Sequence, residues 1–200
     1  MKILIIGGVA AGTKAAAKLK RENRDLDITI IAKDGDISYA GCGLPYYIGG
    51  FIKDRSSLIV NTPQKYAAMT GVSVLTNVEA ITVDNNNHTV IAKNLITNEE
   101  ASYAYDKLII ATGASPITPP IEGVKKQGVF SLRLPNDAVN IRDYVTNNQV
   151  KKAVIVGGGF IGLEVAENLL AQKVDVTVID FAPQIMPNVI DPEIASYVQK

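Results

Sequence analysis

The sequence has one cysteine and one histidine in 200 residues, and its 20 acidic side chains balance its 20 basic ones. A single thiol excludes an internal disulfide framework and a zinc site made of several cysteines, so we predict no metal centre. Balanced charge without a dense Lys/Arg block gives no electrostatic basis for binding nucleic acid or a membrane surface. The apolar runs are strand-sized, and we recognise no signal peptide or membrane span. These absences favour a cytoplasmic protein.

An internal repeat is the strongest signal that the sequence contains. Residues 2–19 align without gaps on residues 152–169, and residues 27–32 align on residues 175–180. Each copy runs from a short apolar segment through a glycine-rich turn into a segment with helical periodicity, which is typical of a nucleotide-binding βαβ unit. We therefore predict an α/β protein with two Rossmann-type units, because a repeat at this distance is not a solenoid period.

The pattern changes between the two copies. Residues 62–70 have the signals of a short capped helix. From residue 72 to 105, the segments VSVLT, VEAITVD, HTVIA and ASYAY read as strands, with a turn at 85–87. We expect a small antiparallel meander there. Residues 106–113 then read as a buried strand, and residues 136–148 as a helix.

These elements predict three parts in the chain. A first nucleotide-binding domain covers residues 1–113, a connector with a helix covers 114–149, and the first part of a second nucleotide-binding domain covers 150–200. The segment from Asp191 to Lys200 starts like a helix. Because a doubly wound domain needs further strands to bury both faces of its sheet, we expect the second unit to be incomplete and the protein to be longer.

The second glycine loop has the complete GxGxxG pattern. Gly157 permits the tight turn, Gly159 lets a pyrophosphate approach the backbone, and Gly162 allows close helix–strand packing. Asp180 stands at the end of the next strand, where a carboxylate can accept hydrogen bonds from a ribose diol. No arginine or lysine follows it to meet a 2′-phosphate, so NADH is favoured and NADPH is the alternative.

The first glycine loop departs from this pattern. Gly7 and Gly12 are present, but Val9 replaces the middle glycine and Ala32 replaces the acid. We still expect a nucleotide here, with weakened ribose recognition. The candidate contacts just after the strand are Lys33 for phosphate and Asp34 for ribose.

Cys42 lies in SYAGCGLPYYIGG, shortly after the first βαβ unit. The following Gly43-Leu44-Pro45 resembles the opening turn of a helix, which would direct free N–H groups and the helix dipole toward the thiol and favour the thiolate. A cysteine that only fills space is the alternative. With no second cysteine in the chain, its reaction partner must come from outside this segment.

Together, GGVAAG, SYAGCGLPYYIGG, YDKLIIATGASP and VIVGGGFIGLEVAENL resemble the single-cysteine branch of the FAD-dependent pyridine nucleotide-disulfide oxidoreductases. The pattern is most similar to coenzyme A-disulfide reductase, with NADH oxidase and NADH peroxidase as relatives. The resemblance implies that the first unit binds FAD and the second a reduced nicotinamide nucleotide. The further cofactor-binding residues are Gly8, Ala10, Ala11, Ala111, Thr112, Gly113, Phe160, Ile161 and Glu164.

The resemblance also implies a reaction. Electrons pass from NAD(P)H through flavin to Cys42 and on to a low-molecular-weight disulfide, chiefly coenzyme A disulfide. The alternative is an NADH oxidase or peroxidase that cycles through a Cys42 sulfenic acid. Ala10 stands where that branch has a histidine, and His88 lies in the meander turn, so disulfide reduction is favoured.

By the same resemblance, the substrate contacts fall on Lys14, Lys18, Arg21 and Ser38. The three cations share one helix face and suit the phosphates of coenzyme A, and a solvated polar face is the alternative. Gly41 departs from the family's asparagine. The family also implies a homodimer formed through C-terminal segments outside this chain, and little turnover by residues 1–200 alone. A non-catalytic nucleotide-binding fragment is the alternative from another class.

Overall fold

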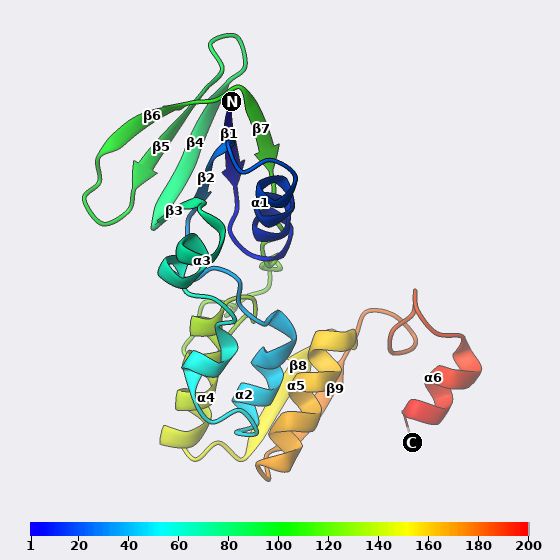
Figure 1. Cartoon of the computed structure of the whole chain (residues 1–200). Coiled ribbons are helices and arrows are strands. Elements are labelled where there is room, and N and C mark those ends of the chain that lie inside the picture. Colours follow the sequence, from blue (N-terminus) through cyan, green and yellow to red (C-terminus); the bar gives the residue numbers. More distant parts are fainter. Residues whose placement is uncertain (200) are drawn as a thin grey trace. The chain divides into compact units, whose positions relative to one another are not determined.

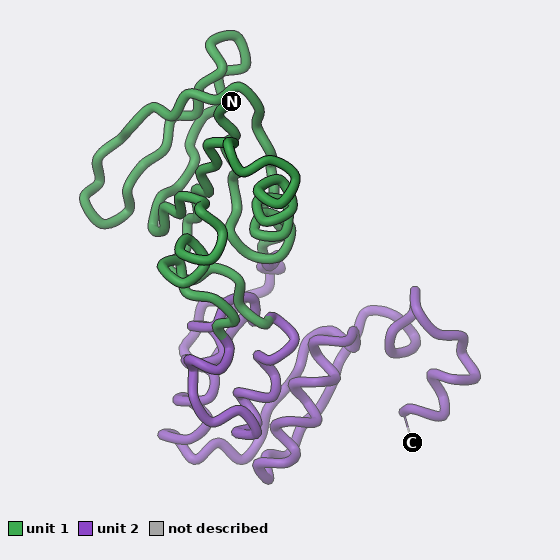
Figure 2. Tube along the Cα trace, viewed as in Figure 1, with its two compact units in different colours: residues 1–40, 59–115 green, residues 41–58, 116–200 purple. Residues whose placement is uncertain are grey.

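The computed structural model describes residues 1–199 and contains two compact units. Unit 1 comprises residues 1–40 and 59–115, and unit 2 comprises residues 41–58 and 116–200 (Figure 2). Cys42 therefore belongs to the same unit as the second glycine turn. The boundaries at residues 113 and 149 separate the predicted nucleotide-binding domains from their connector. They describe ligand binding rather than compactness, so they stay a prediction.

A parallel sheet of four strands forms the centre of unit 1, in the order β3-β2-β1-β7. All three pairings are parallel, and Ile5 in the first strand lies opposite both Ile30 and Ile109. Continuous apolar runs suit the two inner strands of such a sheet, because both of their faces are covered. The expectation of a buried strand over 106–113 was wrong in part, since the strand forms at the edge of the sheet and is only half-buried. The strands are β1 (Lys2–Ile6), β2 (Asp27–Ala32), β3 (Ser73–Thr76) and β7 (Lys107–Ile110).

Alternate residues of β1 face two separate apolar cores. Ile3 and Ile5 pack in the core that contains Ala16 of α1 (Ala10–Glu22) and Tyr66 of α3 (Pro63–Thr70). Leu4 packs on the other face, with residues of the three-stranded sheet. The period of two in a strand explains this division, and Figure 1 shows α1 and the smaller sheet on opposite sides of β1 and β2.

The smaller sheet is an antiparallel meander of β4 (Val78–Asp84), β5 (Thr89–Asn94) and β6 (Glu100–Ala104). The expectation that VSVLT is its first strand was wrong. This segment is β3, which pairs parallel with β2 at the edge of the main sheet. A parallel pairing needs a long crossover, and the segment containing α3 supplies it. The helix expected over 62–70 is confirmed as α3, where the Thr62 side chain accepts a hydrogen bond from the Lys65 N–H at 3.2 Å.

Unit 2 contains the second copy of the repeat. Parallel strands β8 (Lys152–Val156) and β9 (Asp175–Ile179) are joined by α5 (Phe160–Ala171). The expected α/β class and the helices expected near 136–148 and after Asp191 are confirmed. The remaining elements are the 3₁₀ turns η1 (Gly41–Gly43) and η2 (Arg55–Leu58) and the helices α2 (Leu44–Ile48), α4 (Pro135–Asn147) and α6 (Pro192–Val198).

Helix α2 packs against both α4 and α5, as Figure 1 shows. Its Leu44, Pro45, Tyr47 and Ile48 are buried. Within residues 1–199, no helix is long and apolar enough to cross a membrane.

Candidate nucleotide turns and the Cys42 segment

The two glycine turns share one backbone geometry. Gly7 and Gly157 have φ values of 111° and 114°, which favour glycine because it has no Cβ atom. The Gly7 N–H donates to the carbonyl of Ile31, and the Gly157 N–H donates to the carbonyl of Ile179, both at 2.8 Å. The turn in each copy is thus fastened to the carboxyl end of the neighbouring strand.

Neither turn leaves room for a side chain at its last glycine. A Cβ atom on Gly12 would lie 1.9 Å from the Gly7 carbonyl oxygen, and one on Gly162 would lie 2.0 Å from that of Gly157. Gly159 differs, because nothing lies within 4 Å of a Cβ atom placed there. Space inside the protein therefore requires glycine at 12 and 162, whereas Gly159 leaves open space beside the backbone.

The helices that follow the turns begin without a capping side chain. The N-cap residues are Val9 for α1 and Gly159 for α5, neither makes a side-chain cap hydrogen bond, and neither first turn contains an acidic residue. The first N–H groups of a helix have no partner in the helix and attract anions. The residues present at both turns therefore fit a phosphate-containing ligand.

The two copies differ at the position expected for the ribose. Asp180 accepts hydrogen bonds from the N–H groups of Ala182 at 2.7 Å and Gly158 at 2.6 Å. These bonds, with that of Ala182 the stronger cause, hold the pKa of the Asp180 carboxyl below its usual range. Ala32 in the first copy is buried, and its side chain has no hydrogen-bond acceptor.

The structural repeat extends beyond the sequence repeat, to Ser38 and Met186. Both residues have left-handed backbone, with φ of 49° and 45°. The Ser38 N–H donates to the carbonyl of Gly8 at 2.9 Å, and the Met186 N–H donates to that of Gly158 at 3.0 Å. Sequence reasoning missed Met186, because residues 32–38 and 180–186 share only the isoleucine before the last position. That shared isoleucine was the available signal.

Contacts within unit 1 hold Ser38 in this conformation. Its carbonyl accepts a hydrogen bond from the Val60 N–H at 3.0 Å, and its hydroxyl lies 3.5 Å from the amide nitrogen of Asn61. A residue with a side chain in the left-handed region costs about 1–3 kcal/mol and persists only where its surroundings fix it. The backbone of Ser38 is thus tied directly to the first glycine turn.

The segment after β7 lies against the first glycine turn. The Ala111 N–H donates to the carbonyl of Ile6 at 2.8 Å, and the Ala111 carbonyl oxygen would lie 2.1 Å from a Cβ atom on Gly7. Gly113 has a φ of 71°. The structure therefore brings two of the sequence-predicted cofactor segments, at 7–12 and 111–113, together.

The candidate cations of unit 1 are exposed, and two of them form ion pairs. Lys33 donates to Glu79 at 2.8 Å, and this hydrogen bond raises the pKa of Lys33. Lys18 pairs with Glu22, one turn further along α1. Lys14 and Arg21 are also exposed on α1. The expected cationic face is therefore present, with the charge of Lys18 partly offset.

Cys42 is a free, exposed cysteine at the centre of η1. Gly43 is the N-cap of the five-residue α2, and Pro45 lies in the first turn, as the sequence predicts. The exposure of the thiol contradicts the alternative of a space-filling cysteine. Within residues 1–199, Cys42 is open to solvent.

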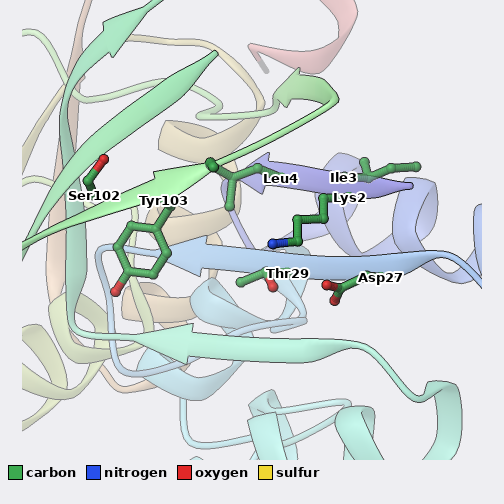
Figure 3. Close-up of a pocket in the computed structure, with 8 residues that line it drawn as sticks. Lys2, Ile3, Leu4, Asp27, Thr29, Ser102 and Tyr103 are labelled. Carbon is green, nitrogen blue, oxygen red and sulfur yellow. The ribbon is translucent and has the colours of Figure 1, made fainter. Parts of the chain in front are cut away.

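A pocket of about 230 Å³ lies elsewhere in unit 1 (Figure 3). Lys2 and Asp27, at the amino ends of β1 and β2, line it together with Tyr103 of β6. The first glycine turn follows the carboxyl end of β1, so this pocket lies at the other end of the strands.

The fold and the two glycine turns define a protein of the dinucleotide-binding α/β class. The family profile described as pyridine nucleotide-disulphide oxidoreductase matches residues 1–200. The chain belongs to this family, which confirms the resemblance drawn from the sequence.

Individual relatives support this assignment. The "NADH oxidase" of Methanocaldococcus jannaschii is 40% identical over 200 residues, which cover 100% of this chain and 44% of the relative. The "Coenzyme A disulfide reductase" of Staphylococcus haemolyticus is 39% identical over 178 residues, covering 89% of this chain and 40% of the relative. The crystal structure of reduced Bacillus anthracis CoADR-RHD has a TM-score of 0.96 and 39% identity, covering 99% of this chain and 36% of that one. The chain thus spans less than half the length of these relatives.

Proposed function

We propose that the full-length protein is an FAD-containing, NAD(P)H-dependent reductase of low-molecular-weight disulfides, with coenzyme A disulfide as its main substrate. The observation that carries the proposal is the exposed Cys42, which is the only cysteine in a chain with two dinucleotide-type glycine turns. Such a thiol has no partner within the chain, so the second sulfur comes from the substrate. The coenzyme A disulfide reductase of S. haemolyticus supports this choice.

The two glycine turns hold different cofactors in this proposal. The first, with residues 7–12 and 111–113, holds FAD, and the second, with residues 157–162, holds the nicotinamide nucleotide. Bound flavin supplies a two-electron relay between a reduced nicotinamide and sulfur. Asp180 favours NADH, because its carboxylate can accept hydrogen bonds from a free ribose diol and repels a 2′-phosphate. Glu164, in the first turns of α5, stays a further candidate contact.

The sulfur chemistry follows from the single thiol. The Cys42 thiolate attacks one sulfur of the substrate disulfide, the S–S bond breaks, and one thiolate leaves. The product is a mixed disulfide between Cys42 and the other half of the substrate. Two electrons and a proton then release the second thiol and restore the Cys42 thiolate. One NAD(P)H is oxidised for each disulfide reduced to two thiols.

Exposed cations support coenzyme A as the thiol. Lys14, Lys18 and Arg21 lie on α1, whose first turn adjoins the first glycine loop. Ammonium and guanidinium groups bind phosphate through charge-assisted hydrogen bonds. We assign these three residues and Ser38 to substrate binding.

Replacement of Cys42 by serine in the full-length protein tests the proposal. We expect disulfide reduction to fall at least a thousandfold, while flavin content and NADH affinity stay within twofold of the parent. NADH consumption with coenzyme A disulfide at the parental rate would refute a role for this sulfur. A purified protein without flavin absorbance bands would instead support a non-catalytic nucleotide-binding function.

The NADH oxidase of M. jannaschii favours a second candidate function. Peroxide would oxidise the Cys42 thiolate to a sulfenic acid and release hydroxide, and two electrons with two protons would then restore the thiol and release water. Ala10 disfavours this oxidase or peroxidase function, because the first glycine turn lacks the histidine that the resemblance associates with sulfenic acid chemistry. NADH consumption with coenzyme A disulfide, polysulfide, peroxide and oxygen in parallel separates the two functions.

The proposal also includes the location and the oligomeric state of the full-length protein. A lone thiol that must be reduced between turnovers suits the reducing cytoplasm. We also propose a homodimer, which light scattering on the full-length protein would detect. Nucleic acid and membranes are not among its partners.

A further inference from the structure

We infer that Asn168 and Gln172 on α5 are positioning residues for the segment that carries Cys42. They hold the C-terminal end of α2, so that the helix that begins at the second glycine turn also fixes the place of the thiol. The inference rests on the proposed function, in which Cys42 is the reacting sulfur.

Close contact between Gly49 and Asn168 joins the two helices. Gly49 is the C-cap of α2, and a Cβ atom placed on it would lie 2.1 Å from Oδ1 and 2.9 Å from Cβ of Asn168. The φ of Gly49 is −67°, which any residue can adopt. Glycine is therefore required here by the space that Asn168 occupies.

A hydrogen bond joins the same two elements one turn further along α5. The side-chain amide of Gln172 donates to the backbone carbonyl of Ile48, the last residue of α2. The last carbonyl groups of a helix have no partner within it, so an external donor there fixes the helix end. Gln172 is the C-cap residue of α5, and Ile48 is fully buried.

Packing alone does not explain why the side chain at 168 is polar. Asn168 is only 2% exposed, and its amide nitrogen donates to the carbonyl of Glu164 at 2.8 Å. Its Oδ1 has no hydrogen-bond partner within residues 1–199, and it faces Gly49. An unpaired buried oxygen costs free energy, which a leucine of similar volume would avoid. We attribute the retained amide to its close contact with Gly49, which sets the distance between α5 and the end of α2.

The spacing along α5 links the nucleotide turn to the thiol. Glu164, Asn168 and Gln172 are four residues apart, so they lie along one face of α5, whose N-cap residue is Gly159. Helix α2 is only five residues long, and η1 with Cys42 precedes it directly. Because a helix advances only about 1.5 Å per residue, the two ends of such a short helix lie close together. A shift at its C-terminal end therefore also moves its beginning.

The test measures the reactivity of the Cys42 thiol directly in the full-length protein. Alkylation of Cys42 by iodoacetamide is followed by mass spectrometry of its peptide, from pH 6 to pH 10, with and without NADH. We expect Asn168→Ala and Gln172→Glu to change the alkylation rate at least threefold and to shift its pH profile. We expect kcat for disulfide reduction to fall by a similar factor, with KM for NADH within twofold. Lower thermal stability with an unchanged rate and pH profile would show a merely structural role and overturn the inference.

A pair of compensating substitutions tests the contact between Gly49 and Asn168. Gly49→Ala alone should perturb alkylation, because the new methyl group overlaps Asn168, and the double variant Gly49→Ala with Asn168→Gly should return toward the parental rate. No recovery in a folded double variant would contradict the positioning contact. Glu167→Gln is the matched control, since Glu167 is exposed on the same helix. If the parent protein reduces no disulfide, the proposed function fails, but the alkylation rates still decide whether α5 positions Cys42.

Discussion

The carboxylate of Asp180 accepts a hydrogen bond from the backbone N–H of Gly158, with 2.6 Å between nitrogen and oxygen. A second bond from Ala182 holds the same carboxylate at the end of β9. In the first copy, the position of Asp180 is taken by the buried Ala32. The two turns therefore share their backbone but not their charge, which is why we assign a different nucleotide to each.

Replacing Asp180 by asparagine should weaken NADH binding about tenfold, because a charged acceptor makes stronger hydrogen bonds than a neutral one. Titration calorimetry on the full-length protein measures this. The lowered pKa keeps Asp180 ionised at every pH above the usual carboxyl range, so its contribution is lost only as the pH falls through and below that range. Asp175→Asn, at the opposite end of β9, is the control and should bind NADH normally. Equal affinity in Asp180→Asn would remove this residue from the nucleotide site.

Gly159 and Gly162 of the second GxGxxG motif should respond differently to alanine. Gly162→Ala forces a methyl group within 2.0 Å of the Gly157 carbonyl oxygen, so we expect a loss of stability of about 2–4 kcal/mol. Gly159→Ala adds its methyl group to open space, so stability should change by less than about 0.5 kcal/mol. NADH affinity should nevertheless fall at least tenfold, because that space is where the pyrophosphate approaches the backbone. Urea unfolding and NADH titration separate the two effects, and unchanged affinity in Gly159→Ala would contradict a ligand there.

Local patterns in the sequence predicted both βαβ units, because apolar strands, glycine turns and helical periodicity are properties of a few neighbouring residues. The strand with which the segment VSVLT pairs could not be predicted from such local patterns. The alternation of this segment suits an antiparallel strand as well as a parallel edge strand, and pairing with β2 depends on the crossover through α3. Strand pairing is decided by distant segments, which a local pattern does not contain.

The residues of the candidate site also divide into those that local sequence patterns predict and those that they do not. Gly7, Gly12, Gly157 and Gly162 could be chosen from the sequence, because only glycine permits these turns. Met186 could not, since its role depends on a backbone hydrogen bond to Gly158 rather than on its side chain. The contact between Gly49 and Asn168 joins residues far apart in the chain. They lie in two separate motifs, SYAGCGLPYYIGG and VIVGGGFIGLEVAENL, and nothing in either motif indicates that the two residues meet.

Tyr66 should make the stability of unit 1 fall at alkaline pH. Its hydroxyl donates to the carbonyl of Thr13, and burial raises the pKa of this phenol above its usual 10.0. The fold therefore favours the neutral phenol, so its contribution is complete below pH 10.0 and is lost as the pH rises through the raised value.

Tyr66→Phe tests this dependence. At pH 7 the variant should be less stable by about 1 kcal/mol, because one hydrogen bond is lost. Above pH 10 the two proteins should converge, since phenylalanine does not ionise. Urea unfolding between pH 7 and pH 11 provides the comparison, and parallel curves would show that the pKa of Tyr66 is the same in the folded and the unfolded protein, against the raised value expected here.

Arg142 should hold the chain that follows α2. Its guanidinium lies 4.6 Å from the centre of the Tyr47 ring and donates to the carbonyls of Ile52 and Lys53 at 3.2 and 3.0 Å. A cation over an aromatic ring contributes about 0.5–2 kcal/mol, and hydrogen bonds from a charged donor about 1.5–3 kcal/mol. Arg142→Met keeps the apolar stem and removes these interactions, so we expect a loss of about 2–4 kcal/mol.

Arg142→Lys should lose roughly half as much, because an ammonium group keeps the charge but does not reproduce the planar fork of donors. Urea unfolding gives the stability of each variant, and limited proteolysis shows whether cleavage within residues 49–58 becomes faster. Asp143→Asn, an exposed neighbour on α4, is the control and should change stability by less than about 0.5 kcal/mol. If Arg142→Met were as stable and as resistant to protease as the parent, the order of this segment would come from α2 itself, through its buried Leu44, Tyr47 and Ile48.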